Sequence, residues 1–140
     1  MYFLGLPARH IPPLLLGTAT TVACFPCYFN VPWAIGHYGL PERIASSPAA
    51  HSPWMLYTNR AHVVGMLILT FLAKRNYAAV DTVMAFIGFM GAMDVYVCLK
   101  EDVSKTATWR GIASGLMAAW GLFGMTQVSQ NIRRILSRLS

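Results

Sequence analysis

The residues best able to do chemistry in this chain lie near one end of its apolar segments. Arg60 lies early in one expected helix, Asp94 lies near the end of the next, and Arg110 lies near the start of a third. A short turn joins the first two helices, so they are antiparallel, and at about 1.5 Å per residue Arg60 and Asp94 lie roughly 8 Å inside one face. An ionised group in hydrocarbon costs about 2.5–3.5 kcal/mol, so such groups turn inward and pair. We therefore expect an Arg60–Asp94 pair.

Two roles for this polar cluster remain open at the level of sequence. The pair could be a lock that fixes which helices pack together, or it could belong to a polar pocket for a lipophilic substrate. In a pocket, Asp94 or His62 would transfer protons, because burial and charge can move the pKa of a carboxyl or imidazole group toward neutrality. Arg60 and Arg110 would stabilise a developing enolate or phenolate oxyanion.

Two further polar residues are expected to bind the substrate. Asn59 adjoins Arg60 in the sequence, and His37 lies in the connection that leads to the same face. The reactions that these residue types favour are proton transfer beside a carbonyl, cyclisation, or oxygenation of an activated phenol without a cofactor.

Other catalytic chemistries have weaker support. Cys24 and Cys27 form a C-x-x-C pair on a helix, which thiol–quinone redox proteins use, but no loop carries a partner pair, and Cys98 is the only other cysteine. The four histidines share no metal-ligand spacing, so no metal site is expected, and His10 and His51 are expected to be solvated loop residues. No glycine-rich phosphate loop occurs, and no cofactor is expected.

The remaining acidic residues of the apolar part of the chain are expected to be solvated charges at helix ends. They are Asp81, Glu101 and Asp102.

Composition indicates the solvent in which these residues must be positioned. The 140 residues are 56% hydrophobic and only 11% charged, whereas soluble domains carry about 25% charged residues. A soluble chain near 150 residues buries only about 70% of its surface on folding, which is too little to hide this much apolar area. The net charge of +6 comes from scattered Lys and Arg without a basic stripe, so we expect membrane lipid as a partner and no nucleic acid.

Apolar runs and breakers predict an all-α membrane protein, a four-transmembrane-helix bundle over residues 1–125. The expected helices cover about residues 12–30, 54–73, 78–99 and 106–125, with a proline-rich loop over 31–53. Four aromatic residues in and beside this loop are expected at the lipid headgroup level, namely Trp33, Tyr38, Trp54 and Tyr57. Residues 126–140, with three arginines between apolar residues, predict a short basic amphipathic tail on the membrane surface.

The distribution of basic residues predicts the orientation of the bundle. The two termini and the turn near residue 75 carry six Lys and Arg residues, whereas the opposite connections carry three. Both termini are therefore expected in the cytoplasm of a multi-pass membrane protein, in the endoplasmic reticulum if the cell is eukaryotic.

Small residues at a spacing of four predict where helices pack closely inside the bundle. The stripes are Ala107, Gly111, Gly115 and Ala119 in the last helix, and Gly88 and Ala92 in the helix before it.

Three short segments resemble a known family of small integral membrane proteins, the Domain of Unknown Function 4267 family. Residues 38–41 are similar to its F-G-L-P turn, and residues 91–94 are similar to its G-D segment. In the expected helix over 54–73, residues 59–61 and the apolar run after them are similar to its R-D-L-x-x-G-L helix. The resemblance covers about residues 12–125 and implies four membrane helices. The chain departs from the family where His62 lies near the usual acid.

The resemblance also implies a functional setting. Small polytopic proteins of this kind often accompany secondary-metabolite enzymes, and some similar families act without cofactors. The expected function is thus an accessory enzyme of polyketide or terpenoid biosynthesis, with a lipophilic small molecule and other pathway enzymes as partners. The alternative is a non-catalytic membrane scaffold, anchor or small transporter component, and the sequence does not decide whether the protein is an enzyme.

Overall fold

The computed structural model describes residues 2–3 and 6–127, and almost all of them are helical. The long helices are α1 (Ile11–Cys24), α4 (Pro48–Ala73), α5 (Tyr77–Lys100) and α6 (Ser104–Leu122). Shorter elements are η1 (Ala8–His10), η2 (Pro26–Tyr28), α2 (Val31–Tyr38) and α3 (Glu42–Ala45). Two-residue strands β1 (Tyr2–Phe3) and β2 (Leu6–Pro7) pair antiparallel.

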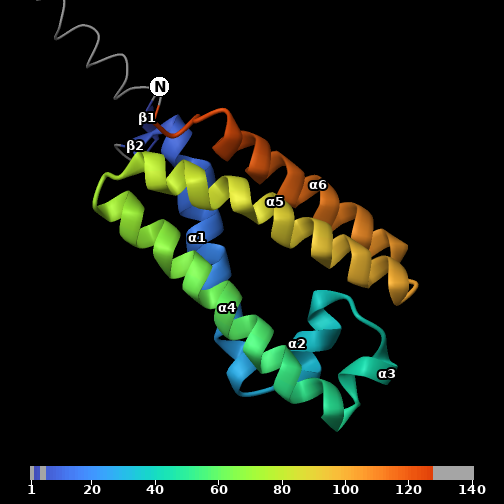
Figure 1. The fold of residues 1–140 in the computed structure, drawn as a ribbon. Helices are drawn as coiled ribbons and strands as arrows, with labels where there is room; N and C mark the ends of the chain where they lie inside the picture. The colour runs from blue at the N-terminus through green and yellow to red at the C-terminus, as the bar shows by residue number, and fades with distance from the viewer. Residues whose placement is uncertain (1, 4–5, 128–140) are drawn as a thin grey trace, which may run out of the picture.

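The long helices form two pairs that diverge from each other (Figure 1). Helix α1 packs along α4, and α5 packs along α6. The pairs are joined at the α4–α5 turn and separate toward the other end, where α2 and α3 lie. A small core holds the narrow end together through Ile68 of α4 and Val80 and Met84 of α5, all fully buried. The wide end, near α2, is therefore where a cavity between the pairs can form.

Among the described residues, three helical segments have the length and hydropathy needed to cross a membrane. They are Ala8–Tyr28, Pro48–Ala73 and Tyr77–Lys100. Large apolar side chains lie on the outside of the molecule, for example Phe86 at 69% and Phe89 at 72% exposure. Exposed apolar surface of this extent in a small chain suits contact with lipid rather than water. The expected all-helical, membrane-compatible class is confirmed at this level.

The connection over residues 31–53 is mostly helical, so the expectation of a loop there was wrong. Proline lacks an N–H, which costs nothing in the first turn of a helix, and Pro32 and Pro48 occupy this position in α2 and α4. The Asn30 side chain accepts the Trp33 backbone N–H at 3.1 Å and caps α2. Gly39 ends α2 with a φ of +99°, a conformation that favours glycine.

The predicted ends of the long helices need smaller corrections. Helix α1 stops at Cys24 and gives way to the 3₁₀ turn η2 because Pro26 cannot continue the α-helical bonding, so the expected helix over 12–30 is too long. Helix α4 ends at Ala73 as expected, α5 extends one residue further at each end, and α6 lies about two residues earlier. The expected tail falls on residues 126–140, of which 128–140 lie outside the described part of the chain.

The seam between α5 and α6 uses small residues, as predicted, but not always those at a spacing of four. A Cβ on Gly88 would lie 2.7 Å from Ala118, and one on Gly91 would collide with Ser114, whereas one on Gly115 would meet nothing within 4 Å. A spacing of four drifts around a helix that has 3.6 residues per turn. The seam therefore follows alternating steps of four and three, through Ala107, Gly111, Ser114, Ala118 and Gly121.

Three residues expected to be solvated are instead enclosed. Asp81 is only 3% exposed, and its two carboxylate oxygens accept the backbone N–H groups of Thr126 and Gln127, each at 3.1 Å. His10 is also buried, with its ring 4.3 Å from that of Tyr77. His51 lies in α4, half-buried, with Nε2 3.0 Å from the Ala45 carbonyl oxygen. The expectation failed because the chain after α6 and the helix α3 cover these positions.

Candidate functional site

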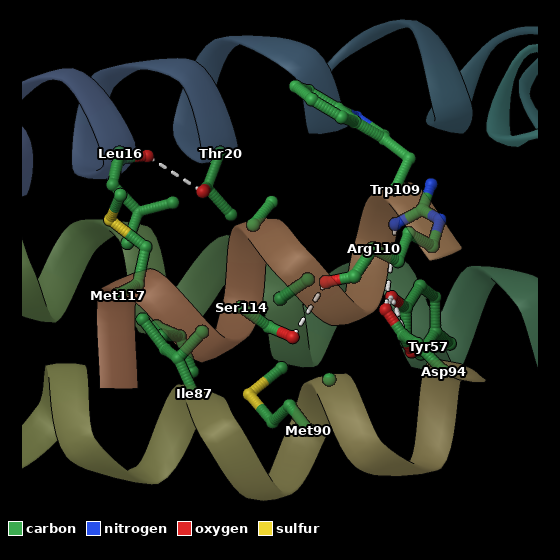
Figure 2. Close-up of a pocket in the computed structure, with 14 residues that line it drawn as sticks. Leu16, Thr20, Tyr57, Ile87, Met90, Asp94, Trp109, Arg110, Ser114 and Met117 are labelled. Atoms are coloured by element: carbon green, nitrogen blue, oxygen red, sulfur yellow. Dashed lines mark hydrogen bonds and ion pairs between the residues drawn. The ribbon is translucent and has the colours of Figure 1, made fainter. Parts of the chain in front are cut away.

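A cavity lies between the two helix pairs, just inside their wide end (Figure 2). Its volume is about 350 Å³, at the lower end of the range of small-molecule sites, about 300–1,000 Å³. All four long helices contribute to its wall, which includes Thr20 of α1, Tyr57 of α4, Asp94 of α5 and Arg110 and Ser114 of α6. Apart from these five, the lining is almost entirely apolar. A charged group and several hydroxyls thus face a small space that otherwise suits a lipophilic molecule.

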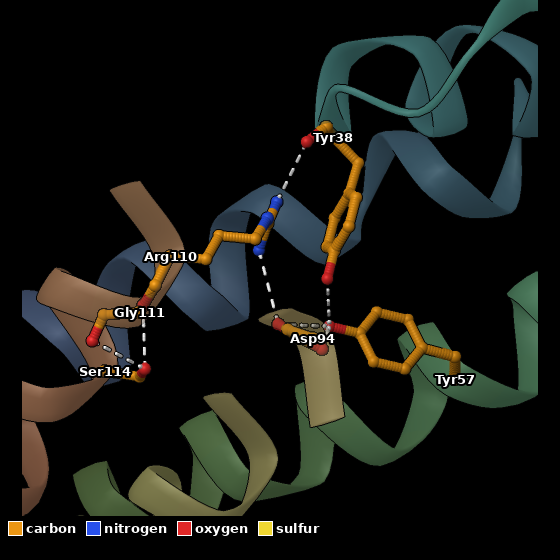
Figure 3. A network of polar contacts seen from close by, with 6 residues as sticks. All are labelled: Tyr38, Tyr57, Asp94, Arg110, Gly111 and Ser114. Atoms are coloured by element: carbon orange, nitrogen blue, oxygen red, sulfur yellow. Dashed lines mark hydrogen bonds and ion pairs between the residues drawn. The ribbon is translucent and has the colours of Figure 1, made fainter. Parts of the chain in front are cut away.

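The polar end of this cavity is a network centred on Asp94 (Figure 3). The Tyr57 hydroxyl donates toward both carboxylate oxygens of Asp94, at 3.4 Å each. Nη1 of Arg110 lies 3.5 Å from Oδ2 of Asp94. The Tyr38 hydroxyl lies 3.5 Å from that of Tyr57. Asp94 of α5 therefore has a cation from α6 and a phenol from α4 within reach.

The distances in this network are long. Charge-assisted hydrogen bonds are usually about 2.7–2.9 Å, and each contact of Asp94 exceeds 3.3 Å. Its side chain is nevertheless only 19% exposed, and that of Arg110 is 27% exposed. The carboxylate is thus enclosed without being tightly held, so its oxygens can still accept a proton or a further hydrogen bond.

Arg110 connects the network to α2. Its Nη2 donates to the Tyr38 carbonyl at 3.2 Å, and its guanidinium carbon lies 3.1 Å from the centroid of the Tyr38 ring. This placement over the ring face is a cation–π contact. The Arg110 Nε is buried and has no hydrogen-bond partner in the described part of the chain. This buried donor of the cation therefore lacks a partner in the described part of the chain.

Tyr38 is held protonated by its surroundings. Burial raises the pKa of its hydroxyl far above the usual range, the neighbouring Tyr57 raises this pKa further, and Arg110 lowers it in part. A neutral phenol keeps its proton and can donate it in a hydrogen bond. Tyr38 thus contributes a donor to the network, not a negative charge that would compete with Asp94 for Arg110.

The structure brings together only two of the four expected catalytic residues, Asp94 and Arg110. Arg60 does not pair with Asp94, so the expected ion pair was wrong. It lies halfway along α4 on an exposed face with Leu56 and Val63, and within the described residues it has no ion pair or hydrogen bond. Tyr57, three residues earlier, faces the cavity instead because α4 turns by 100° per residue.

The other predicted site residues also lie apart from Asp94. His62 faces η2, where its Nδ1 lies 3.2 Å from the Tyr28 hydroxyl, and its ring lies 5.2 Å from that of Phe25, the residue before η2. Asn59 is exposed and does not line the cavity that contains Asp94. His37 is stacked on Trp33 with ring centroids 4.8 Å apart, and it lines a different cavity, near α2.

Sequence reasoning overlooked the two tyrosines of the network. Tyr38 and Tyr57 were assigned to the headgroup region because aromatic residues near loops are common there. A signal was present: Tyr57, Ala61 and Val64 recur at steps of four and three, and all three line the cavity. The position of Tyr38 was not predictable, because its segment was not recognised as a helix.

Other chemistries find less support in the described part of the chain. Cys24, Cys27 and Cys98 are free thiols, and Cys27 donates to the Ala23 carbonyl at 3.6 Å. No group of three or more potential metal ligands occurs among the described residues.

Comparison with known proteins identifies the family. The family described as Domain of unknown function (DUF4267) matches residues 17–124, and the chain belongs to it. No curated protein and no solved structure matches the chain. The matched region contains α4, α5 and α6 and every residue of the Asp94 network.

Proposed function

We propose that this DUF4267 member is a multi-pass membrane enzyme that moves protons on a lipophilic substrate without a cofactor. The observation that carries the proposal is the loosely held Asp94 carboxylate beside Arg110, at the polar end of an otherwise apolar cavity of about 350 Å³. A base next to a cation is what the removal of a proton beside a carbonyl requires. The family resemblance, not the geometry, suggests that the substrate belongs to polyketide or terpenoid biosynthesis.

The proposed reaction uses the residues of the network directly. An Asp94 oxygen takes a proton from the carbon next to a substrate carbonyl, and the electron pair moves onto the carbonyl oxygen to form an enolate. A free Arg110 N–H donates to that oxyanion, where developing charge is best stabilised. Asp94 then returns the proton to a different atom of the substrate, so that no electrons are gained or lost overall. Closing a ring from the enolate carbon is the related cyclisation.

The orientation in the membrane is part of the proposal. Helix α6 has 19 residues and is about 28 Å long, close to the hydrocarbon thickness of about 30 Å, and it packs along the apolar α5. We infer that it is a fourth span, so that both termini are cytoplasmic and Lys100–Lys105 lies on the opposite side. A glycosylation acceptor inserted after Asp102 should be glycosylated in microsomes, and one added at residue 140 should not. The reverse pattern would refute this orientation.

A non-catalytic scaffold is the second candidate. It is favoured because the contacts of Asp94, Tyr57, Arg110 and Tyr38 join α2, α4, α5 and α6, as a structural lock would. The two candidates predict different effects of replacing Asp94. In an enzyme the folded variant loses activity, whereas in a scaffold the variant loses stability.

The test is isotope exchange on a probe ketone. The protein in lipid nanodiscs is incubated in D₂O with 2-tetralone, a lipophilic ketone with acidic protons beside its carbonyl, and deuterium uptake is followed by mass spectrometry. General base catalysis contributes about 10²–10⁴-fold, so Asp94→Asn should lower the rate above empty nanodiscs by about 100-fold or more. Arg60→Gln is the matched control, since Arg60 lies outside the cavity, and it should exchange like the wild type.

The outcomes separate the two candidates. Loss of exchange in a folded Asp94→Asn protein supports the enzyme. Exchange by the wild type that is no faster than in empty nanodiscs, or an Asp94→Asn variant as fast as the wild type, would refute proton transfer by Asp94. A variant that fails to accumulate in the membrane, while the wild type shows no exchange, supports the scaffold.

A further inference from the structure

A second chamber lies on the other side of Arg110 and Tyr57, toward α2. Its volume is also about 350 Å³, and its wall is made by α1, η2, α2 and α4 together with Arg110 of α6. Thr20, Tyr57, Ala61 and Arg110 line both spaces and form the partition between them. Asp94 lines only the first cavity. The second chamber is therefore a separate binding space with its own chemistry.

Aromatic rings dominate the wall of this chamber. Trp54 lies edge-on to Tyr38, with centroids 4.8 Å apart, and its ring centroid is 5.2 Å from that of Tyr57. Trp33 and His37 are stacked nearly parallel on the α2 side, with 9° between their planes. Aromatic pairs in these arrangements attract flat rings by offset stacking or by edge-to-face contact. The shape and polarity of the wall suit a flat conjugated molecule.

Two buried hydrogen-bond donors in this wall have no partner. They are Nε1 of Trp54 and Nε of Arg110, neither of which has an acceptor within the described chain. A buried donor without a partner costs the full desolvation penalty of that group, so it is usually satisfied by water or a ligand. An indole N–H and a guanidinium N–H can only donate. A ligand in the chamber that brings an acceptor oxygen would satisfy these donors once either side chain turns toward it, and the positive charge of Arg110 favours an oxygen that carries negative partial charge.

We propose that this chamber binds a flat aromatic or conjugated carbonyl compound, whose oxygen accepts from Trp54 Nε1 and Arg110 Nε while its rings stack on the aromatic wall. The site is independent of proton transfer by Asp94, because Asp94 takes no part in the wall. It would hold a ligand, or the ring end of a long substrate, beside the first cavity.

Ligand binding in the chamber can be measured by the protection of a cysteine from a thiol reagent. Cys27 lines the chamber and is half-buried, whereas Cys98 is buried and lines neither cavity. The protein in nanodiscs is treated with N-ethylmaleimide at increasing concentrations of 9-fluorenone, a flat ketone, or of fluorene, which has the same rings without the oxygen. Mass spectrometry then gives the concentration of each compound that halves the labelling rate of Cys27. The slow labelling of Cys98 reports that each variant is folded.

The wild type should be half-protected at Cys27 by about tenfold less fluorenone than fluorene, since satisfying a buried donor is worth roughly a factor of ten. Trp54→Phe keeps an aromatic ring but removes the N–H, so the ratio of the two concentrations should fall to near one. Trp120→Phe is the matched control: it removes an indole N–H that is also buried and unpartnered within the described chain but belongs to a residue outside the chamber wall, and it should keep the tenfold ratio. Comparing the ratio between variants cancels the different partitioning of the two compounds into lipid.

The results can contradict the proposal in two ways that do not depend on catalysis. Equal protection by fluorenone and fluorene in the wild type at equal concentrations within the lipid, or no protection of Cys27 by either compound, would overturn it even if Trp54→Phe did not fold. A Trp54→Phe variant that folds and keeps the tenfold ratio would overturn the role of the indole. Asp94→Asn should leave the ratio unchanged, which separates this site from the proposed catalytic one.

Discussion

Replacing Arg110 and Arg60 by glutamine should have very different effects on stability, although both arginines lie in long helices. Arg110 contacts Asp94, the Tyr38 carbonyl and the Tyr38 ring. Arg60 lies on the exposed face of α4 and, within the described chain, contacts no charged partner. Arg110→Gln therefore leaves an enclosed carboxylate without its cation, whereas Arg60→Gln leaves no group unpaired.

The magnitude follows from the environment of Asp94. Removing one partner of a buried ion pair costs about 3–5 kcal/mol, because the remaining charge stays buried. The cation–π contact, about 0.5–2 kcal/mol elsewhere, is lost in the same substitution and is not simply additive. For a chain of this size each kcal/mol lowers the unfolding midpoint by about 3–4 °C, so Arg110→Gln should lower it by roughly 10 °C or more. Arg60→Gln should change it by less than about 2 °C.

Thermal unfolding in detergent measures both effects. Cys24 and Cys98 are buried, so a thiol-reactive dye reports their exposure as the protein unfolds. The double variant Asp94→Asn with Arg110→Gln removes both charges, and it should recover part of the stability that Arg110→Gln loses. Equal midpoints for the two arginine variants, or a larger loss for Arg60→Gln, would refute the assignment of Arg110 as the partner of Asp94.

Two further substitutions, each with a control, test the packing at the narrow end. Gly121→Ala places a methyl group against the α5 backbone, which cannot yield, and should lower the stability by about 1–3 kcal/mol. Its control, Gly115→Ala, lies in open space and should raise the stability by up to about 1 kcal/mol. Equal unfolding midpoints for the two variants in the same dye assay would contradict this packing. Asp81→Asn removes the charge that accepts two backbone N–H groups and should cost about 1–3 kcal/mol. Exposed Asp102→Asn should be near neutral, and similar losses in the two would show that the buried contacts of Asp81 add nothing.

The sequence by itself determined the class of structure and the extent of the main helices. Long uncharged runs can satisfy their backbone groups in lipid only as helices, so α4 and α5 were placed to within a few residues at most ends. The family was also recognisable from short segments near Tyr38, Arg60 and Asp94. These features depend on local composition and spacing, which need no knowledge of packing.

The tertiary structure alone decided which polar groups meet. Arg60 and Tyr57 are three residues apart, and only the rotation of α4 against α5 decides which one faces Asp94. The same holds for Asp81. Its place near the start of α5 predicts a solvated carboxylate, but the chain after α6 packs over it and encloses it. The sequence gives the position of a residue along its helix, and so its depth in the membrane. It does not give the rotation of that helix about its axis, which decides the neighbours of the residue and is fixed only when the helices pack.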